Sequence, residues 1–335
     1  MKLIVTGAAG FIGMHTALSL LEDGHEVVGI DNLNDYYDLQ LKQDRLEILR
    51  QRASFRFFHL DIVDNAAIAQ TVAAEQPDRL VHLAAQAGVR YSLENPMAYV
   101  SSNLAGFASV LEACRHSQVP HLIYASSSSV YGNNSHVPFS EHDPVDHPLS
   151  LYAASKRANE LMAHAYAHLY NLPVTGLRFF TVYGPWGRPD MAPILFARAI
   201  CEGKTIRVFN HGNHQRDFTY VGDIVQGVMA VALQKVSCTS FTAAMNSDPA
   251  MSTAPFRLYN MGNGAPVKLM DFLATLEKRL GKKALLEMTG AQPGDVLDTW
   301  ADCSDLERDF GYRPQTSLAH GMERFIAWFR EYYRL

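Results

Sequence analysis

Apolar and polar positions alternate along the first half of the chain in a pattern that predicts strands and helices in turn. Short apolar runs rich in β-branched residues predict strands at 2–6, 26–30, 55–60, 79–83, 121–126 and 173–179. Between them, apolar positions recur with the helical period, which predicts helices over 11–22, 38–52, 64–75, 97–118 and 151–171. Strands that alternate with helices form a parallel sheet covered on both faces. The pattern therefore predicts an α/β, doubly wound parallel sheet of the Rossmann type.

The second half of the chain has shorter predicted elements. Helices are expected at 192–202, 222–235, 267–280 and 317–333, with a strand at 205–209. Residues 236–256 are mostly small and polar and include two prolines, which indicates a surface insertion. We expect residues 1–180 to form a nucleotide-binding domain. We expect residues 181–335 to form mainly a smaller, interleaved substrate-binding lobe.

The first predicted strand runs into a glycine-rich turn that opens a helix. Gly7, Gly10 and Gly13 allow a tight turn, a close approach of backbone amides to a pyrophosphate, and close packing of helix on strand. The helix N-terminus then faces the phosphates. Asp31 ends the second strand, where a carboxylate accepts hydrogen bonds from a ribose and repels a 2′-phosphate, so NAD is favoured over NADP.

The other strand ends carry further residues that we expect to contact a dinucleotide. In a doubly wound sheet the ligand lies beyond the carboxyl ends of the strands. The predicted cofactor contacts on this basis are Gly7, Gly10, Phe11, Ile12, Gly13, Asp31, Asn32, Asp61, Ile62, Ala84, Ala85 and Phe179.

Tyr152 and Lys156 lie four residues apart in the predicted helix 151–171, so they share one face of it. An ammonium beside a phenol favours the phenolate and lowers a pKa that starts near ~10. Such a phenol can take a proton from a substrate hydroxyl and return one to a carbonyl. Ser127, at the end of the fifth predicted strand, can hydrogen-bond the same oxygen. We predict that Ser127, Tyr152 and Lys156 are the catalytic residues.

Together these motifs resemble the extended short-chain dehydrogenase/reductases that act on nucleotide sugars, over essentially the whole chain. Four further stretches resemble the UDP-glucuronate 4-epimerases of that family: Asn32–Tyr37, Ala85–Ser92, Arg178–Met191 and Gln292–Val296. The resemblance implies a tightly bound NAD that removes a hydride from C4 of the hexose and returns it to the other face. It also implies that Lys156 holds the nicotinamide ribose, and that Tyr152 and Asn103 belong to the cofactor site.

The resemblance also implies a set of substrate-binding residues. Arg216 would bind the diphosphate of a UDP-sugar, since a guanidinium binds phosphate oxygens in pairs, and Asp295 would bind the far end of the nucleotide. A surface ion pair between Arg216 and Asp217 is the alternative. Oxidation at C4 of a glucuronate creates a β-keto acid, which must be kept from losing carbon dioxide. The residues expected to hold the sugar and its carboxylate are Arg90, Ser128, Ser129, Thr181 and Arg188.

Related activities remain as alternatives. Sugar-nucleotide 4,6-dehydratases and UDP-glucuronate decarboxylases place a carboxylate just after the catalytic serine or threonine, whereas residues 127–130 read Ser-Ser-Ser-Val. This difference favours simple epimerisation, with a UDP-glucose or UDP-N-acetylglucosamine 4-epimerase or a UDP-glucuronate decarboxylase as the other candidates. A non-catalytic NAD-binding regulator is disfavoured because Tyr152 and Lys156 are both present.

Composition and charge limit the partners. The 335 residues are 48% hydrophobic and 19% charged, and the net charge of −5 without a basic block argues against nucleic acid and membrane surfaces. The four cysteines are scattered, so neither a metal site nor a disulfide framework is indicated. The first strand is expected almost at the N-terminus, which predicts a cytoplasmic protein without a signal peptide. A homodimer is expected through Val100, Leu104, Leu161 and Tyr166 on the helices 97–118 and 151–171.

Overall fold

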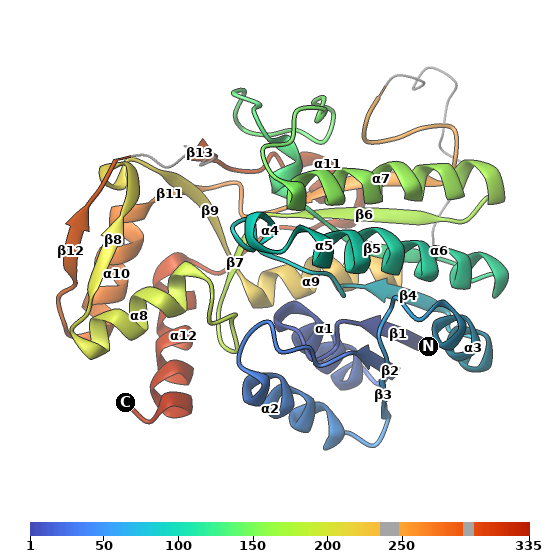
Figure 1. Ribbon diagram of the computed structural model, residues 1–335, viewed down its shortest axis with the longest axis horizontal. Coiled ribbons are helices and arrows are strands. Elements are labelled where there is room, and N and C mark those ends of the chain that lie inside the picture. Colours follow the sequence, from blue (N-terminus) through green and yellow to red (C-terminus); the bar gives the residue numbers. More distant parts are fainter. Residues whose placement is uncertain (235–247, 291–297) are drawn as a thin grey trace.

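The computed structural model describes residues 1–234, 248–290 and 298–335, and its centre is a seven-stranded parallel sheet (Figure 1). The strand order is β10-β6-β5-β4-β1-β2-β3, and every neighbouring pair is parallel. The strands are β1 (Lys2–Thr6), β2 (Glu26–Asp31), β3 (Phe55–His59), β4 (Arg79–His82), β5 (Leu122–Ser127), β6 (Val174–Phe179) and β10 (Phe256–Met261). The predicted doubly wound α/β fold is confirmed.

Helices cover both faces of this sheet and enclose two hydrophobic cores (Figure 1). One face carries α1 (Phe11–Glu22), α2 (Leu39–Arg50) and α9 (Val221–Leu233), whose apolar residues share one core. The other carries α3 (Asn65–Glu75), α6 (Gly106–His116) and α7 (Leu151–Tyr170), which share the second core. Strands buried on both faces are nearly continuously apolar, which is why these runs were visible in the sequence.

The seventh strand, β10, comes from the second half of the chain and was missed by the sequence pattern. Leu258 and Tyr259 are buried, but Arg257 and Asn260 interrupt the apolar run. The segment is a strand because it pairs in parallel with β6, with Tyr259 opposite Leu177. The interleaving of the two halves is therefore built into the sheet, while the boundary near residue 180 stays a prediction.

The helix expected over 97–118 is interrupted in the structure. A short α4 (Tyr91–Glu94) and α5 (Pro96–Tyr99) lead into η1 (Val100–Ala105), a π-helical turn, and only then does α6 begin. A π-helical turn does not alter the apolar spacing enough to be seen in a sequence. It matters here because it carries Asn103.

The second lobe contains small sheets and helices, of which β8 (Thr205–Val208), β12 (Leu285–Met288), α8 (Ala192–Glu202) and α10 (Leu269–Leu280) lie at the left of Figure 1. One sheet joins β7 (Thr181–Tyr183), β9 (Gln215–Tyr220), β11 (Pro266–Lys268) and β13 (Asp298–Thr299), and another pairs β8 with β12. The remaining helices of the lobe are α11 (Ser304–Phe310) and α12 (Leu318–Tyr333). The 3₁₀ turn η3 (Phe209–Gly212) belongs to this lobe, whereas the 3₁₀ turn η2 (Ser128–Tyr131) follows β5 in the first half of the chain. The sequence pattern predicted α8, α9, α10, α12 and β8. It did not predict the strands β7, β9, β11, β12 and β13, most of which are too short to show a periodicity.

The predicted insertion, 236–256, lies partly outside the described residues. Its last part is not a free surface loop, because Ala250 and Ala254 are buried in the core beside α7 and β10. The amide of Leu258 also donates to the Ala250 carbonyl at 2.8 Å. Small residues fit against a sheet edge as well as in a loop, so composition alone did not distinguish the two.

Candidate active site

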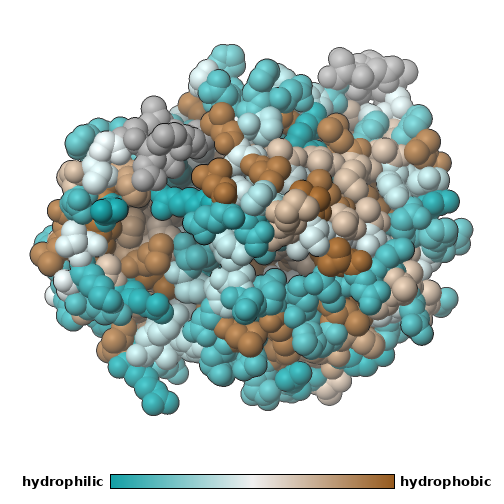
Figure 2. Space-filling view, viewed as in Figure 1, coloured by the Kyte–Doolittle hydropathy of each residue, from teal (hydrophilic) through white to brown (hydrophobic). Residues whose placement is uncertain are grey.

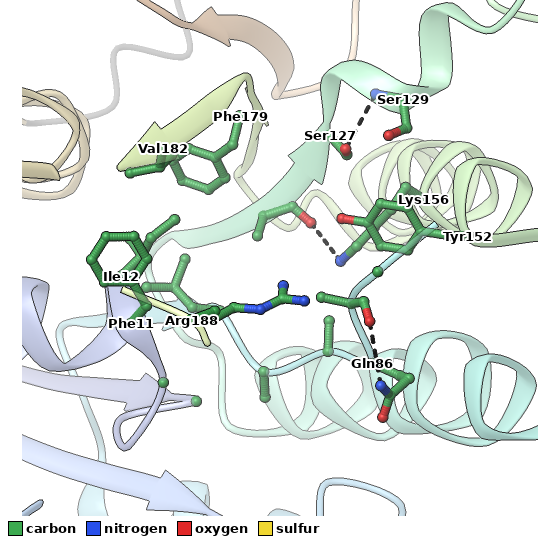
Figure 3. Close-up of a pocket in the computed structure, with 18 of the residues that line it drawn as sticks. Phe11, Ile12, Gln86, Ser127, Ser129, Tyr152, Lys156, Phe179, Val182 and Arg188 are labelled. Carbon is green, nitrogen blue, oxygen red and sulfur yellow. Dashed lines mark hydrogen bonds between the residues drawn. The ribbon is translucent and has the colours of Figure 1, made fainter. Parts of the chain in front are cut away.

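A cavity of about 500 Å³ opens at the carboxyl ends of the parallel strands (Figure 3). The first half of the chain contributes the glycine-rich turn after β1 and the ends of β2 to β6, and the second half contributes β7, β9 and the loop after β7. All of the predicted cofactor contacts except Asn103 line it: Gly7, Gly10, Phe11, Ile12, Gly13, Asp31, Asn32, Asp61, Ile62, Ala84, Ala85, Tyr152, Lys156 and Phe179. Predicted substrate contacts also line it, namely Arg90, Ser128, Ser129, Thr181, Arg188 and Arg216.

The glycine-rich turn fits a pyrophosphate. Gly7 has a φ of +72°, and a Cβ there would lie 2.7 Å from the Ala84 nitrogen. A Cβ on Gly13 would lie 1.9 Å from the Gly7 carbonyl oxygen, so neither position accepts a side chain. Gly10 caps α1 without a side-chain hydrogen bond, which leaves the first amides of the helix available to an anion.

Asp31 is held rigidly at the end of β2. Its carboxylate accepts hydrogen bonds from the Ala9 amide at 3.0 Å and the Leu33 amide at 2.9 Å. Burial raises the pKa of Asp31, and these hydrogen bonds and the charge of Lys42 oppose that rise. Lys42 of α2 is eleven residues beyond Asp31 in the chain, and its charge acts on Asp31 in the folded protein. Its ammonium donates to Asn34, at 2.5 Å to the carbonyl oxygen and 2.7 Å to Oδ1.

The structure brings Ser127, Tyr152 and Lys156 together at one end of the cavity (Figure 3). Helix α7 begins after Ser150, whose hydroxyl accepts from the Ala153 amide, and this cap puts Tyr152 in the first turn. Lys156 follows one turn later and donates to the Ala125 carbonyl of β5 at 3.0 Å. The end of β5 and the start of α7 thus form one corner of the cavity, named the catalytic corner here because it holds the three residues predicted to be catalytic.

The electrostatics of this corner differ from the simple expectation for a tyrosine beside a lysine. Burial raises the pKa of Tyr152, while hydrogen bonding with Ser127 and the positive charge of Arg188 oppose the rise. Burial lowers the pKa of Lys156 to about 8, and the charge of Glu160 opposes that shift. The expected lowering of the phenol pKa is therefore outweighed by desolvation, which penalises the phenolate.

Asn103 lies behind the cavity wall, not in it. Its side chain is buried and donates to the Gln86 carbonyl at 3.0 Å and to the Ser155 hydroxyl at 2.9 Å, while its Oδ1 accepts from the Gln86 amide. Ser155 directly precedes Lys156, and the π-helical turn brings Asn103 within reach of it. The structure therefore gives Asn103 contacts that position the wall and the lysine.

A buried ion pair beneath Lys156 was missed in the sequence. Glu160 lies one turn beyond Lys156 and receives two hydrogen bonds from Arg178 of β6, at 2.8 and 3.0 Å. Both side chains are fully buried, and the Ser126 hydroxyl also donates to Glu160. The spacing of four residues on α7 was the available signal.

Arg188 extends into the cavity from the loop after β7 (Figure 3). Its guanidinium donates to both carboxylate oxygens of Asp190, at 3.1 and 2.5 Å. The Tyr36 hydroxyl donates to the same carboxylate at 3.2 Å. Tyr36 and Asp190 were not predicted to hold Arg188, because the loop is needed to bring them together.

Two further expectations concern the nucleotide end of the cavity. Arg216 of β9 lines the cavity and donates to the Gln215 carbonyl at 3.0 Å. Asp217 is fully buried and accepts from the Asn263, Gly264 and Ala301 amides, so it is not an exposed surface acid. Asp295 lies outside the described residues.

The carboxylates that line the cavity lie at the end formed by β2 and β3. Among the described lining residues these are only Asp31 and Asp61. Asp31 is the last residue of β2, and Asp61 lies between β3 and α3. Asp61 accepts from the Asn32 side chain at 2.9 Å and the Val63 amide at 3.0 Å. Ser127 is separated from them by β4 and β1 in the sheet. No lining carboxylate therefore accompanies Ser127 and Tyr152 in the part of the chain that the structure describes.

Within 1–234, 248–290 and 298–335, no cluster of at least three His, Cys, Asp or Glu side chains has the arrangement of a metal site. Over the same residues, no helix combines the length and the apolar character needed to cross a membrane.

Comparison with known proteins agrees with this geometry. A family model described as the NAD dependent epimerase/dehydratase family matches residues 3–243. Protein CapI of Staphylococcus aureus is 50% identical over 334 residues, covering 100% of each chain, and a probable UDP-glucuronate 4-epimerase of Rhizobium meliloti is 45% identical, covering 100% of this chain and 98% of that protein. The crystal structure of UDP-glucuronic acid 4-epimerase from Bacillus cereus with UDP-glucuronic acid and NAD has a TM-score of 0.88 at 33% identity, covering 99% of this chain and 100% of that one. The glycine-rich turn, the catalytic corner and these relatives together show that this chain belongs to the NAD dependent epimerase/dehydratase family.

Proposed function

We propose that this protein is an NAD-dependent epimerase that interconverts UDP-glucuronate and UDP-galacturonate at C4. The observation that carries the proposal is the cavity end at which Ser127, Tyr152 and Arg188 meet, with no lining carboxylate beside them among the described residues. Arg188 is paired with Asp190 through Nε and Nη2, and it is proposed to bind the sugar carboxylate with the same guanidinium. No carboxylate among the described lining residues of this end could serve beside Tyr152 as the second acid or base of an elimination, and Asp190, outside the lining, is paired with Arg188; this favours epimerisation.

Tyr152 is the proposed acid and base for the sugar O4. It takes the O4 proton as the C–H bond at C4 is broken, and it returns that proton to the carbonyl oxygen of the 4-keto sugar. NAD supplies the hydride acceptor and donor for C4. Lys156 stabilises the phenolate by its charge, and the Ser127 hydroxyl hydrogen-bonds the same sugar oxygen. The 4-keto sugar turns over between the two steps, so no net oxidation occurs.

Arg188 has a second proposed role, which is to restrain the carboxylate. A 4-keto glucuronate is a β-keto acid, and it loses carbon dioxide when the bond from C5 to the carboxylate lies parallel to the carbonyl π system. A guanidinium that pins the carboxylate near the carbonyl plane prevents that alignment. Thr181 and the hydroxyls of Ser128 and Ser129 line the same cavity and are proposed to assist.

The UDP group is assigned to the second lobe. Arg216 of β9 lines the cavity from that lobe, and a planar guanidinium binds two phosphate oxygens at once. Asp295 remains a proposed contact for the far end of the nucleotide.

A product assay tests the proposed reaction. The purified protein, with its NAD content measured, is supplied separately with UDP-glucuronate and UDP-glucose, and products are followed by NMR. The expected product is UDP-galacturonate, with little turnover of UDP-glucose. Preferential conversion of UDP-glucose would support the UDP-glucose 4-epimerase alternative, and a UDP-pentose as main product would support a decarboxylase.

The Arg188→Ala variant tests the carboxylate contact. We expect it to weaken UDP-glucuronate binding by about 1.5–3 kcal/mol, the worth of a hydrogen bond to a charged group. It should also raise the ratio of decarboxylated pentose to UDP-galacturonate. Unchanged affinity together with an unchanged product ratio would remove Arg188 from this role.

We further propose a homodimer formed by α5, η1 and α7. Met97, Val100, Leu161 and Leu169 are exposed by 67, 37, 56 and 65%. Figure 2 shows apolar side chains over this part of the surface. Equal patches that meet about a two-fold axis form an isologous interface. A cytoplasmic location stays a prediction of the sequence.

A further inference from the structure

The loop from Gly184 to Asp190, which carries Arg188, has an unusual backbone. Trp186 has a φ of +60°, a left-handed conformation that non-glycine residues seldom adopt. Gly184 has a φ of +148°, and a Cβ there would lie 2.6 Å from the Val221 side chain. A segment in such a conformation persists only when its surroundings hold it. The contacts that hold this loop therefore decide where Arg188 points.

Arg45 of α2 supplies the most extensive of these contacts. Its side chain is fully buried, and Nη2 donates to the Trp186 carbonyl at 2.7 Å and the Gly187 carbonyl at 3.1 Å. From the other side of the same group, Nη1 donates to the Ala9 carbonyl at 3.1 Å and the Tyr37 hydroxyl at 2.7 Å. One guanidinium thus joins the Arg188 loop to the glycine-rich turn, two segments far apart in sequence.

The form of this contact requires arginine. A planar guanidinium presents its N–H groups in a fixed fork, whereas the ammonium of lysine is a compact charge on a flexible stem. A second attachment lies nearby, where His15 Nε2 of α1 donates to the Pro185 carbonyl at 2.9 Å. Burial lowers the pKa of His15 to about 4, so this ring is neutral at pH 7. Both attachments connect the loop to the first half of the chain, which also forms the cofactor end of the cavity.

We propose that Arg45 is a positioning residue that aims Arg188 at the sugar carboxylate by fixing the Gly184–Asp190 loop against the glycine-rich turn. Arg45 thereby sets the preference for a sugar that carries a carboxylate, although it lies behind the cavity wall. This inference rests on the proposed function, in which Arg188 binds that carboxylate. The expected consequence is selective: a loosened loop weakens the carboxylate contact and leaves the rest of the UDP-sugar contacts in place.

The test compares the Arg45→Lys variant with wild type, both loaded with NAD. Titration calorimetry gives the Kd of UDP-glucuronate and of UDP-glucose, which lacks the carboxylate. We expect the Kd of UDP-glucuronate to rise by about tenfold, as for a lost charge-assisted hydrogen bond, and that of UDP-glucose to change by less than about twofold. Hydrogen exchange of the 184–190 amides should become faster. Arg50→Lys, on the exposed side of the same helix, is the matched control and should change neither Kd.

Other results would overturn the inference. If both Kd values stay unchanged, or both rise equally, Arg45 does not act through Arg188. The His15→Ala variant loosens the same loop at its other attachment, so it should give a smaller shift in the same selective direction. An unselective shift in His15→Ala would overturn the inference even if Arg45→Lys did not fold.

The Arg188→Ala variant separates this inference from the proposed function. If Arg188→Ala selectively weakens UDP-glucuronate and Arg45→Lys does not, the proposed function stands and the role of Arg45 is wrong. If Arg188→Ala does not distinguish the two ligands, the carboxylate contact itself is wrong and the inference falls with it.

Discussion

At the scale of single residues, the chemistry depends on how burial changes two ionisable groups. Tyr152 has a raised pKa because its surroundings desolvate the phenolate, so at pH 7 it carries its proton. Lys156 has a lowered pKa of about 8 for the corresponding reason, since burial disfavours the ammonium. The two shifts move the pKa values apart and reverse their order, because the pKa of Tyr152 lies above its ordinary value of 10.0 and that of Lys156 lies below its ordinary value of 10.5. Proton exchange with a sugar hydroxyl then depends on charges that ligands and Arg188 add to the corner.

Replacing Tyr152 with phenylalanine should remove most turnover. The hydroxyl serves proton transfer, a contribution of about 10²–10⁴-fold in rate. The ring still packs against Tyr99, with centroids 6.0 Å apart. Because the lost hydroxyl acts in the chemical step, the Kd for UDP-glucuronate should stay within about twofold of the wild-type value. Tyr170→Phe, at the exposed end of the same helix, is the control for steady-state kinetics and calorimetry. Near-normal turnover in Tyr152→Phe would show that Tyr152 is only a packing residue.

The pH dependence of kcat should report the ionisation of the Lys156 side chain. Below its pKa of about 8 the side chain carries the charge that stabilises the phenolate, and above that pH the charge is lost. We therefore expect kcat to fall as pH rises past about 8, and not near the value of ~10.4 that an unperturbed lysine would give. Initial rates with saturating substrate, with folding checked by circular dichroism at each pH, measure this limb. Constant kcat up to about pH 10 would contradict the assignment.

At the scale of elements, β5 and α7 form the catalytic corner and β6 supports it from below. Ser127 ends β5, whereas Tyr152 and Lys156 lie in the first turns of α7. Arg178 of β6 pairs with Glu160 of α7, so the ion pair joins strand to helix at the level of the lysine. Arg178 also donates to the Tyr131 hydroxyl at 3.1 Å, which extends the network to η2.

Breaking this pair should destabilise the protein strongly. Arg178→Met leaves Glu160 as a buried charge without its main partner, which costs about 3–5 kcal/mol in the free energy of unfolding. Urea denaturation at one protein concentration measures the loss. Adding Glu160→Leu to Arg178→Met should recover part of it, because the buried charge is then removed.

An exposed pair provides the comparison for Arg178. Arg115 and Glu112 of α6 are about one-third exposed, at 34 and 32%. Arg115→Met should therefore cost no more than about 1 kcal/mol. Equal costs for Arg178→Met and Arg115→Met would show that the buried pair contributes nothing particular to stability.

At the scale of the whole molecule, the second half of the chain completes the first. β10 forms the seventh strand of the sheet, and α9 packs on the same face as α1. Trp186, in the Arg188 loop, packs against Trp328 and Tyr332 of α12, with ring centroids 5.4 and 5.1 Å away. The Tyr332 hydroxyl donates to Asp44 of α2 at 2.6 Å. The Gly184–Asp190 loop is therefore held between both halves of the chain, by Arg45 of α2 and by the rings of α12.

The proposed homodimer predicts a mass of about 75 kDa in solution, twice the 37.3 kDa of one chain. Leu161→Glu places a charge in the proposed interface and should shift the protein toward a monomer, as light scattering measures. Leu195→Glu is the control, because Leu195 is similarly exposed, at 49%, but lies on α8 of the other lobe. A monomeric wild type at micromolar concentration would refute the interface.

Much of the site was readable along the chain because it follows local rules. The glycine spacing, the acid at the end of β2 and the Tyr–Lys spacing on one helix each depend on residues only a few positions apart. Parallel strands that end at one edge then bring these motifs into one cavity. The strands of the first half were likewise visible, since burial on both faces makes most of their runs apolar. The edge strand β3 is only partly buried, and its three phenylalanines made it visible.

Other features depended on contacts between distant segments, and local patterns do not record such contacts. Arg45 reads as an ordinary helix residue, and only the fold places it under Trp186 and Gly187. Asn103 reaches Ser155 through a π-helical turn, and β10 is a strand because β6 pairs with it. The pKa of Tyr152 was misjudged for the same reason, since desolvation is set by everything packed around the ring. Spacing along the chain places groups on a helix face or strand end, whereas burial and long-range hydrogen bonds arise only when the chain has folded.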